Sequence, residues 1–245
     1  MGTTIEPVFQ FRGAKIGFNS QDRFMITRSD ELVVIRQDGL VFGAKIAGTD
    51  IEPVFQFSGA KLGFNPQDRF MVSLGFNPLV VIRQDGLVFG ANIVGTGHGP
   101  HIQPVFQFTG AAIGFNSVDK FMVAAANSPV FNAPQNTLVV IRQDGLVFGA
   151  NVVDRNIQPV FQFSGAKIGF HPLDRFMVAM GNRLVVIRSD GLVFGADIVG
   201  REVQPVFQFS GAKIGFHPLD RFMVARGNEV IVIRQDGLVF GALVV

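Results

Sequence analysis

"PVFQFSGAKIGFHPLDRFMVARGNEVIVIRQDGLVFGA" occupies Pro205–Ala242, and close variants of this segment fill nearly all of the preceding chain. The copies recur at intervals of roughly 46 residues or slightly more, beginning at Pro7, Pro53, Pro104, Pro159 and Pro205. Self-similarity at such a period is typical of an array of equivalent structural units. The repeat therefore decides the fold.

Each copy predicts four β-strands. The apolar segments are short, rich in Val, Ile and Phe, and bounded by Gly, Pro, Asn or Asp, and helical periodicity is absent. In the last copy we expect strands around 206–216, with a break at the Ser-Gly-Ala segment, and at 221–224, 230–234 and 238–242. Asp236-Gly237 between the last two strands is a strong hairpin signal. Pro218 and Asp220 predict a turn between the first two.

The copies differ in length only at certain positions. The spacing from the Val of "VFQF" to the Met of "RFM" is the same in every copy, and the "QDG" or "SDG" hairpin turn never changes length. Extra residues occur at 73–78, 95–101 and 124–137. In a meander of antiparallel strands, the constant turns share one face of the molecule and the variable loops share the opposite face. We call the first of these the constant-turn face.

These observations predict an all-β fold, a five-bladed β-propeller with four antiparallel strands per blade and five-fold pseudosymmetry. An isolated meander of this length is marginally stable, and radial packing around a central channel buries both faces of each sheet. Phenylalanines are expected to form the core between blades. We expect one domain over residues 1–245, with blades at approximately 1–48, 49–97, 98–153, 154–200 and 201–245.

Three other architectures compete with the propeller. A β-trefoil also uses four-strand units, and "DGLVFGADI" followed by "QPVFQF" resembles the strand rhythm of fascin-like trefoils, but a trefoil closes with three units. An open solenoid needs polar terminal repeats, and the first and last copies here resemble the middle ones. An outer-membrane barrel needs longer strands and aromatic girdles, and the chain contains no Trp or Tyr.

Composition excludes several function classes. The net charge is only +2 with dispersed basic residues, which disfavours nucleic-acid binding. Cysteine is absent, so disulfides and thiolate chemistry are excluded. No apolar run could cross a membrane and no signal peptide is visible, so cytoplasmic residence is the default expectation. No Ser–His arrangement or phosphate-cradling loop occurs, and we expect no enzyme, no metal and no cofactor.

The segment "IGFHPLDRFMVARGNEVIVIR", Ile214–Arg234, resembles the blade of tachylectin-type five-bladed propeller lectins. Blades of that family also run an aromatic strand into a Pro-containing turn and a short hairpin. The resemblance covers the whole chain in period and copy number. It implies a propeller that binds N-acetylated sugars with one site per blade. The sites of that family include Trp or Tyr, which this chain lacks.

Polar residues that recur once per copy are the candidate ligand contacts. Asn and His replace one another at one position, which indicates a hydrogen-bonding role and not a metal site. An Asp follows three residues later, and an Arg precedes the hairpin. The alternative is that these residues form turns and Asp–Arg pairs. The three sets are Asn19, Asn65, Asn116, His171 and His217; Asp22, Asp68, Asp119, Asp174 and Asp220; Arg36, Arg83, Arg142, Arg188 and Arg234.

The sequence thus predicts a non-enzymatic, multivalent carbohydrate-binding protein whose partners are glycans or glycoproteins. Sites are expected in crevices between blades, because pockets favour junctions of structural elements. One Gln per copy, as in Gln10, could line either the channel or such a crevice. The alternative is a scaffold or protein-interaction propeller without a small ligand, natural or engineered from duplicated modules. The oligomeric state is left open.

Overall fold

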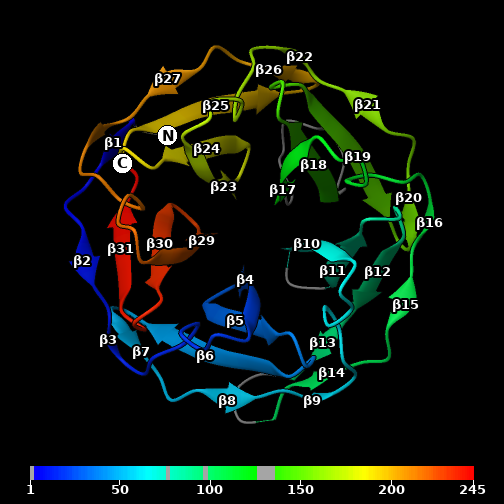
Figure 1. Cartoon of the computed structure of the whole chain (residues 1–245), viewed down its shortest axis with the longest axis vertical. Helices are drawn as coiled ribbons and strands as arrows, with labels where there is room; N and C mark the ends of the chain where they lie inside the picture. The colour runs from blue at the N-terminus through cyan, green and yellow to red at the C-terminus, as the bar shows by residue number, and fades with distance from the viewer. Residues whose placement is uncertain (1–2, 76–77, 96–98, 126–135) are drawn as a thin grey trace.

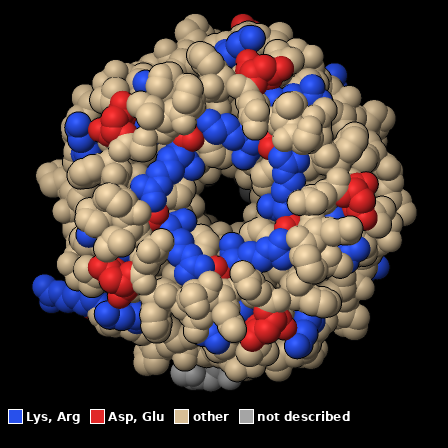
Figure 2. Space-filling view, in the orientation of Figure 1, with Lys and Arg blue, Asp and Glu red and all other residues tan. Residues whose placement is uncertain are grey.

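The computed structural model describes residues 3–75, 78–95, 99–125 and 136–245. Its regular elements in these ranges are β-strands, arranged as sheets around a central axis (Figure 1), and the space-filling view shows an open channel there (Figure 2). The β-propeller and its repeated blades are confirmed. Within the same ranges no helix has the length and apolar character needed to cross a bilayer.

The innermost strand of each blade starts at the recurrent Asp and lies beside the channel. These strands contact one another in a closed ring, each touching the next and the last touching the first. They are β4 (Asp22–Arg28), β10 (Asp68–Ser73), β17 (Asp119–Ala125), β23 (Asp174–Met180) and β29 (Asp220–Arg226).

The next two strands of each blade form the predicted Asp-Gly hairpin. The second strands are β5 (Glu31–Arg36), β11 (Leu79–Arg83), β18 (Asn136–Arg142), β24 (Arg183–Arg188) and β30 (Glu229–Arg234). The third strands are β6 (Val41–Ala47), β12 (Val88–Ala91), β19 (Val147–Val153), β25 (Val193–Val199) and β31 (Val239–Leu243). Asp38 caps the turn of the first hairpin by accepting a hydrogen bond from the backbone N–H of Leu40 (2.9 Å).

The outermost strand of each blade comes from the following copy. It is a two-residue Phe-Gln strand that pairs antiparallel with the third strand of the copy before it. These strands are β8 (Phe55–Gln56), β15 (Phe106–Gln107), β21 (Phe161–Gln162), β27 (Phe207–Gln208) and β2 (Phe9–Gln10). Each structural blade is therefore offset by one strand from the sequence copy.

A second set of short strands follows the break at the Ser-Gly-Ala segment or its equivalents. They are β3 (Arg12–Gly13), β9 (Ser58–Gly59), β16 (Thr109–Gly110), β22 (Ser164–Gly165) and β28 (Ser210–Gly211). Each pairs in parallel with a strand from the segment before another copy, namely β7 (Asp50–Ile51), β14 (His101–Ile102), β20 (Asn156–Ile157), β26 (Glu202–Val203) and β1 (Thr4–Ile5). β13 (Ile93–Val94) pairs with β14.

The expected fold class, a five-bladed propeller with four antiparallel strands in each blade, is therefore wrong and needs correction. Three of the sheets in the described residues have six strands, others have two to four, and parallel pairs join them. The reason is the break in the first predicted strand. The chain leaves its antiparallel partner there and makes a second, parallel pairing with another copy.

The hydrophobic core lies between the sheets. Strand β5 shows this arrangement, because its alternate side chains point to opposite faces. Val33 and Ile35 pack against Leu79 of the next blade, whereas Leu32 and Val34 pack against Ile231 and its neighbours in the preceding blade. A strand that is buried on both faces reads as a continuous apolar run, which explains "LVVI".

Pairs of phenylalanines cover the outer part of each interface. The rings of Phe9 and Phe11 are tilted, with centroids 5.1 Å apart. Both lie against Gly241 of β31, where an added Cβ would overlap their ring atoms. The same arrangement recurs in the other copies, which explains the Gly in "VFGA".

The N-terminal segment closes the ring. Strand β2 pairs with β31, and the backbone N–H of Thr4 donates to the carbonyl oxygen of Val245 (3.0 Å). The two ends of the chain therefore lie side by side in one blade (Figure 1). The last blade depends on residues from the first copy.

Substituting Phe11 tests this closure. We expect Phe11→Ala to lower the free energy of unfolding by about 3–5 kcal/mol, because it leaves a cavity in the interface that joins the two ends. Urea denaturation would measure the change. Phe18→Ala, in the same copy but half-exposed, is the matched control and should change stability by less than about 1 kcal/mol. Equal effects of the two substitutions would contradict the arrangement.

Candidate functional site

The predicted Asn or His, Asp and Arg meet on the constant-turn face in every copy. Asp22 is buried, and its Oδ2 accepts a hydrogen bond from the backbone N–H of Asn19 (2.9 Å). Its Oδ1 accepts one from Nε of Arg36 (3.2 Å), which lies opposite in the β4–β5 ladder. In the third copy Arg142 and Asp119 form an ion pair at 3.4 Å. The acids are thus engaged within the protein.

The Asn or His side chain shapes the turn. Oδ1 of Asn19 accepts a hydrogen bond from the backbone N–H of Gln21 (2.9 Å), and Nδ1 of His171 accepts one from that of Leu173 (3.1 Å). Both residue types place an acceptor at the same point, which explains why they interchange. These contacts support the turn-forming alternative. Ligand binding by the predicted residues stays a prediction.

The paired arginines keep part of their side chains accessible. Cζ of Arg36 lies 4.2 Å from the centroid of the Phe42 ring, and about a quarter of the side chain is exposed (25%). The same stacking occurs in each copy. The buried Asp and the ring therefore hold the guanidinium in place, and its outer edge faces solvent.

The expectation that the phenylalanines form the core is wrong for one residue per copy. The Phe before the Asn or His is half-exposed, at 46–53%: Phe18, Phe64, Phe115, Phe170 and Phe216. The preceding Gly17 has a φ of +76°, which L side chains rarely adopt, and an added Cβ would overlap Met25. This bend takes the following Phe out of the core. The Gly-Phe-Asn order, outside any alternating pattern, is the sequence signal for it.

The exposed Phe borders a hollow in the last blade. The hollow has a volume of about 180 Å³ and is lined by Phe216, Lys213, Asp220, Arg234 and the exposed Val8, among others. Two of the predicted site residues thus contribute to it. Its chemistry combines an accessible aromatic face with a guanidinium, an arrangement suited to a ligand with both apolar and hydroxyl groups.

A third basic residue joins neighbouring blades. Arg23 occupies a β-bulge between Asp22 and Phe24, and its guanidinium donates to the carbonyl oxygens of Asn65, Pro66 (3.2 Å) and Asp68 in the next copy. We call this set of bonds the inter-blade clasp. Arg69, Arg175 and Arg221 make equivalent bonds.

Lys120 takes the place of the clasp arginine in the third copy. Its ammonium donates to the carbonyl oxygen of His171 (2.9 Å), its one hydrogen bond within the described ranges. Burial lowers the pKa of Lys120 below its ordinary value, and the nearby carboxylate of Asp174 opposes this effect less strongly. The clasp between these two blades is therefore the weakest of the set.

The glutamines of the outermost strands are exposed. Gln10 and Gln107 line crevices between blades, with volumes of about 400 and 250 Å³. The structure thus places these side chains at crevices and not in the channel. No cluster of three or more potential metal ligands occurs among the residues described. Parts of the insertions, at 76–77, 96–98 and 126–135, lie outside those residues.

Comparisons with known proteins show the fold and no family. No protein-family model and no curated protein matches the chain. Among solved structures, Myxococcus xanthus glutaminyl cyclase has a TM-score of 0.52 and 8% identity, and the match covers 99% of this chain and 97% of that one. BamB from Moraxella catarrhalis has a TM-score of 0.33 and 14% identity, covering 89% and 71%. The WD40 domain of SCAP from fission yeast has a TM-score of 0.38 and 13% identity, covering 96% and 50%.

The expectation that the chain is not an enzyme is corrected by the first of these structures. Glutaminyl cyclase is an enzyme and shares this fold over nearly the whole length of both chains. A propeller therefore gives no ground for excluding catalysis. At 8% identity the likeness shows the fold alone and assigns no reaction.

The clasp generates a pair of reciprocal predictions. Lys120→Arg should raise the free energy of unfolding by about 1 kcal/mol, because the guanidinium can reach carbonyl oxygens that the ammonium does not. Arg69→Lys should lower it by about 1–2 kcal/mol, because two or more hydrogen bonds are lost. Chemical denaturation would measure both. A stabilising Arg69→Lys would refute the clasp.

The buried acid generates a second prediction. Asp220→Asn should lower the free energy of unfolding by about 1.5–3 kcal/mol, because Arg234 loses its carboxylate partner. The control is Asp236→Asn in the exposed hairpin, which keeps an acceptor for the N–H of Leu238 and should change stability by less than about 0.5 kcal/mol. Thermal and urea unfolding would compare them, and similar losses would contradict a special role for the buried acid.

Proposed function

We propose that this protein is a multivalent carbohydrate-binding propeller whose sites surround the half-exposed Phe of each copy. The observation that supports it most is the repetition of that Phe, at 46–53% exposure, on one face of the molecule, whereas the other aromatic residues that the structure describes are more buried. Exposed apolar residues that lie together mark interaction sites more often than single ones do, and each Phe has an exposed Val equivalent to Val8 in its copy.

The neighbours of each Phe suit a sugar. An aromatic face packs against the C–H groups of a pyranose, and the Arg234 guanidinium and the His217 ring edge offer donors for hydroxyl or N-acetyl oxygens. The hollow beside Phe216 is small, about 180 Å³, which fits one terminal sugar residue and not a long chain. Each site would bind weakly by itself.

Multivalency would make such weak sites effective. Several sites at fixed positions on one face can increase avidity by about 10²–10⁴-fold over a single site when the target also repeats. The partners that fit this arrangement are glycans or glycoproteins displayed densely on a surface. The resemblance to tachylectin-type lectins agrees with this reading, although the chain has none of the Trp or Tyr found in those sites.

A protein-interaction scaffold is the second candidate. It is favoured by a second exposed apolar residue in the same hollow, Val8 at 38%, beside Phe216. Equivalent valines are similarly exposed: Val54, Val105, Val160 and Val206. Two adjacent apolar side chains in each copy would suit a repeated apolar peptide as well as a sugar.

A glycan array tests the first proposal. We expect the protein to bind densely printed glycans, and the variant with Ser at positions 18, 64, 115, 170 and 216 to lose about 10²-fold or more of that avidity. The control carries Val94→Ser and Val199→Ser, two exposed valines outside the hollow; it keeps every Phe and should bind the array as the unmodified protein does. Circular dichroism would verify folding. Absence of glycan binding by the unmodified protein would refute carbohydrate binding and leave the scaffold.

A further inference from the structure

Basic side chains surround one opening of the central channel. Figure 2 shows Lys and Arg in an almost continuous ring around that opening, with most of the acidic side chains further out. The clasp residues follow the first residue of each innermost strand, which places them at the constant-turn end of the channel. They are Arg23, Arg69, Lys120, Arg175 and Arg221. We call them the mouth cations.

The mouth cations form no ion pair with a carboxylate in the described part of the chain, although Asp174 lies near Lys120. Among the described residues none of them lies within ion-pair distance of an Asp or Glu, since their partners are backbone carbonyl oxygens. The buried acids beside them are paired with the other arginine set, as Asp22 is with Arg36. Ten basic residues and five acids at this opening leave a local charge of +5, compared with +2 for the whole chain.

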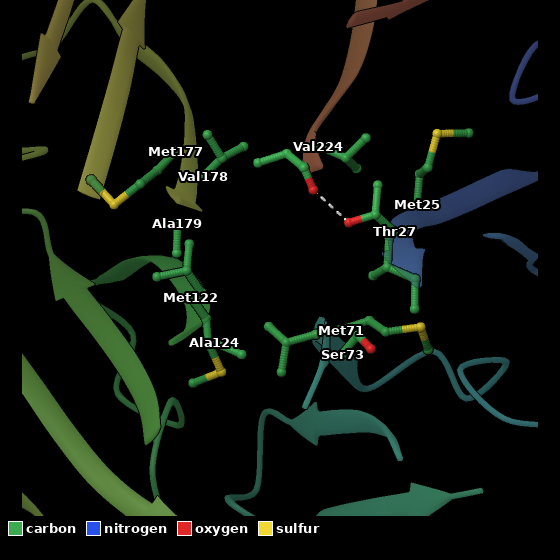
Figure 3. Close-up of a pocket in the computed structure, with 14 residues that line it drawn as sticks. Met25, Thr27, Met71, Ser73, Met122, Ala124, Met177, Val178, Ala179 and Val224 are labelled. Atoms are coloured by element: carbon green, nitrogen blue, oxygen red, sulfur yellow. Dashed lines mark hydrogen bonds between the residues drawn. The ribbon is translucent and has the colours of Figure 1, made fainter. Parts of the chain in front are cut away.

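The other acids of this face lie further from the channel than the mouth cations (Figure 2). The hairpin acids, such as Asp38, lie between the second and third strands of each blade and not at the innermost strand. Deeper in the channel the lining is apolar or small, with Thr27, Val178, Ala179 and Val224 around a volume of about 130 Å³ (Figure 3). The hydroxyl of Thr27 donates to the carbonyl oxygen of Ala225 (2.7 Å). An anion would therefore be held at the mouth and not within the channel.

We propose that the mouth cations form a binding site, separate from the Phe hollows, for a compact small molecule that carries several phosphate groups. Guanidinium groups present N–H donors in a planar fork that matches phosphate oxygens. Each clasp arginine has five such donors, of which the clasp uses three, so two remain for a ligand. A ring of positive charge around an axis favours a ligand whose own charges are spread around a centre. The bulge that positions each arginine is a common device for aiming a side chain into a site.

Titration with inorganic tripolyphosphate tests the proposal. We expect calorimetry at low ionic strength to show one saturable site per chain, weakening steeply as salt is added, because the charges are partly exposed. Citrate, a compact anion with carboxylates and no phosphate, should bind more weakly under the same conditions. No saturable binding of tripolyphosphate, or equal binding of citrate, would overturn the proposal.

Variants that change charge without touching the clasp locate the site. Gln21 and Gln67 are exposed and directly precede the acids of the innermost strands, so Gln21→Glu with Gln67→Glu adds two carboxylates near the mouth. We expect this variant to bind tripolyphosphate about tenfold more weakly. The control, Gln10→Glu with Gln56→Glu, makes the same chemical change in exposed outermost strands and should bind within about twofold of the unmodified protein. Equal weakening by both variants would show a diffuse charge effect and refute the mouth site.

Discussion

The packing of each sheet between two others is the constraint on which the rest of this structure depends. The second strand of each blade is buried on both faces, and its apolar side chains divide between two neighbours, as Leu32 and Val33 do in β5. No layer of helices covers a sheet in the described residues. Every copy must therefore offer one surface that fits the preceding blade and another that fits the next. This mutual fit accounts for the near-identity of the copies in their strands and for their tolerance of insertions in the variable loops.

Polar contacts at the constant-turn face fix the same geometry more specifically. The buried Asp holds the turn that precedes its own strand and the Arg of the adjacent strand, while the bulge residue reaches the next blade. Each buried Asp thus accepts its hydrogen bonds from residues of its own copy, whereas each clasp residue donates its hydrogen bonds to the next blade. Because the two sets differ in their partners, they differ in charge balance. The positive charge of Arg36 is balanced by the carboxylate of Asp22. Arg23 instead donates to uncharged carbonyl oxygens, so its positive charge is not balanced in this way.

Much of this fold could be predicted from the sequence, because the signals for it are local. The Asp-Gly hairpin and the double-sided apolar run of the second strand need no knowledge of distant partners. The sequence predicted a strand over each Phe-Gln segment but could not assign its partner in the preceding copy. A two-residue strand has no periodicity of its own, and β8 is defined only by its pairing with β6 from the preceding copy. The parallel pairing of β3 with β7 joins the two ends of one copy, and local sequence patterns do not predict it either.

The site was less predictable than the fold for a related reason. Residue type identified the polar sets but left two interpretations open, ligand contact or turns with Asp–Arg pairs. Only the structure shows that Asp22 accepts hydrogen bonds from Asn19 and Arg36. Residue type also assigned Phe18 to the core, where its half-exposed side chain does not lie. What separates Phe18 from Phe11 is the backbone bend at Gly17, since a strand residue continues into the interface and a residue after a bend leaves it. The exposure of this Phe thus follows from the positive φ of the glycine before it. The same φ recurs in each copy because the glycine that permits it recurs.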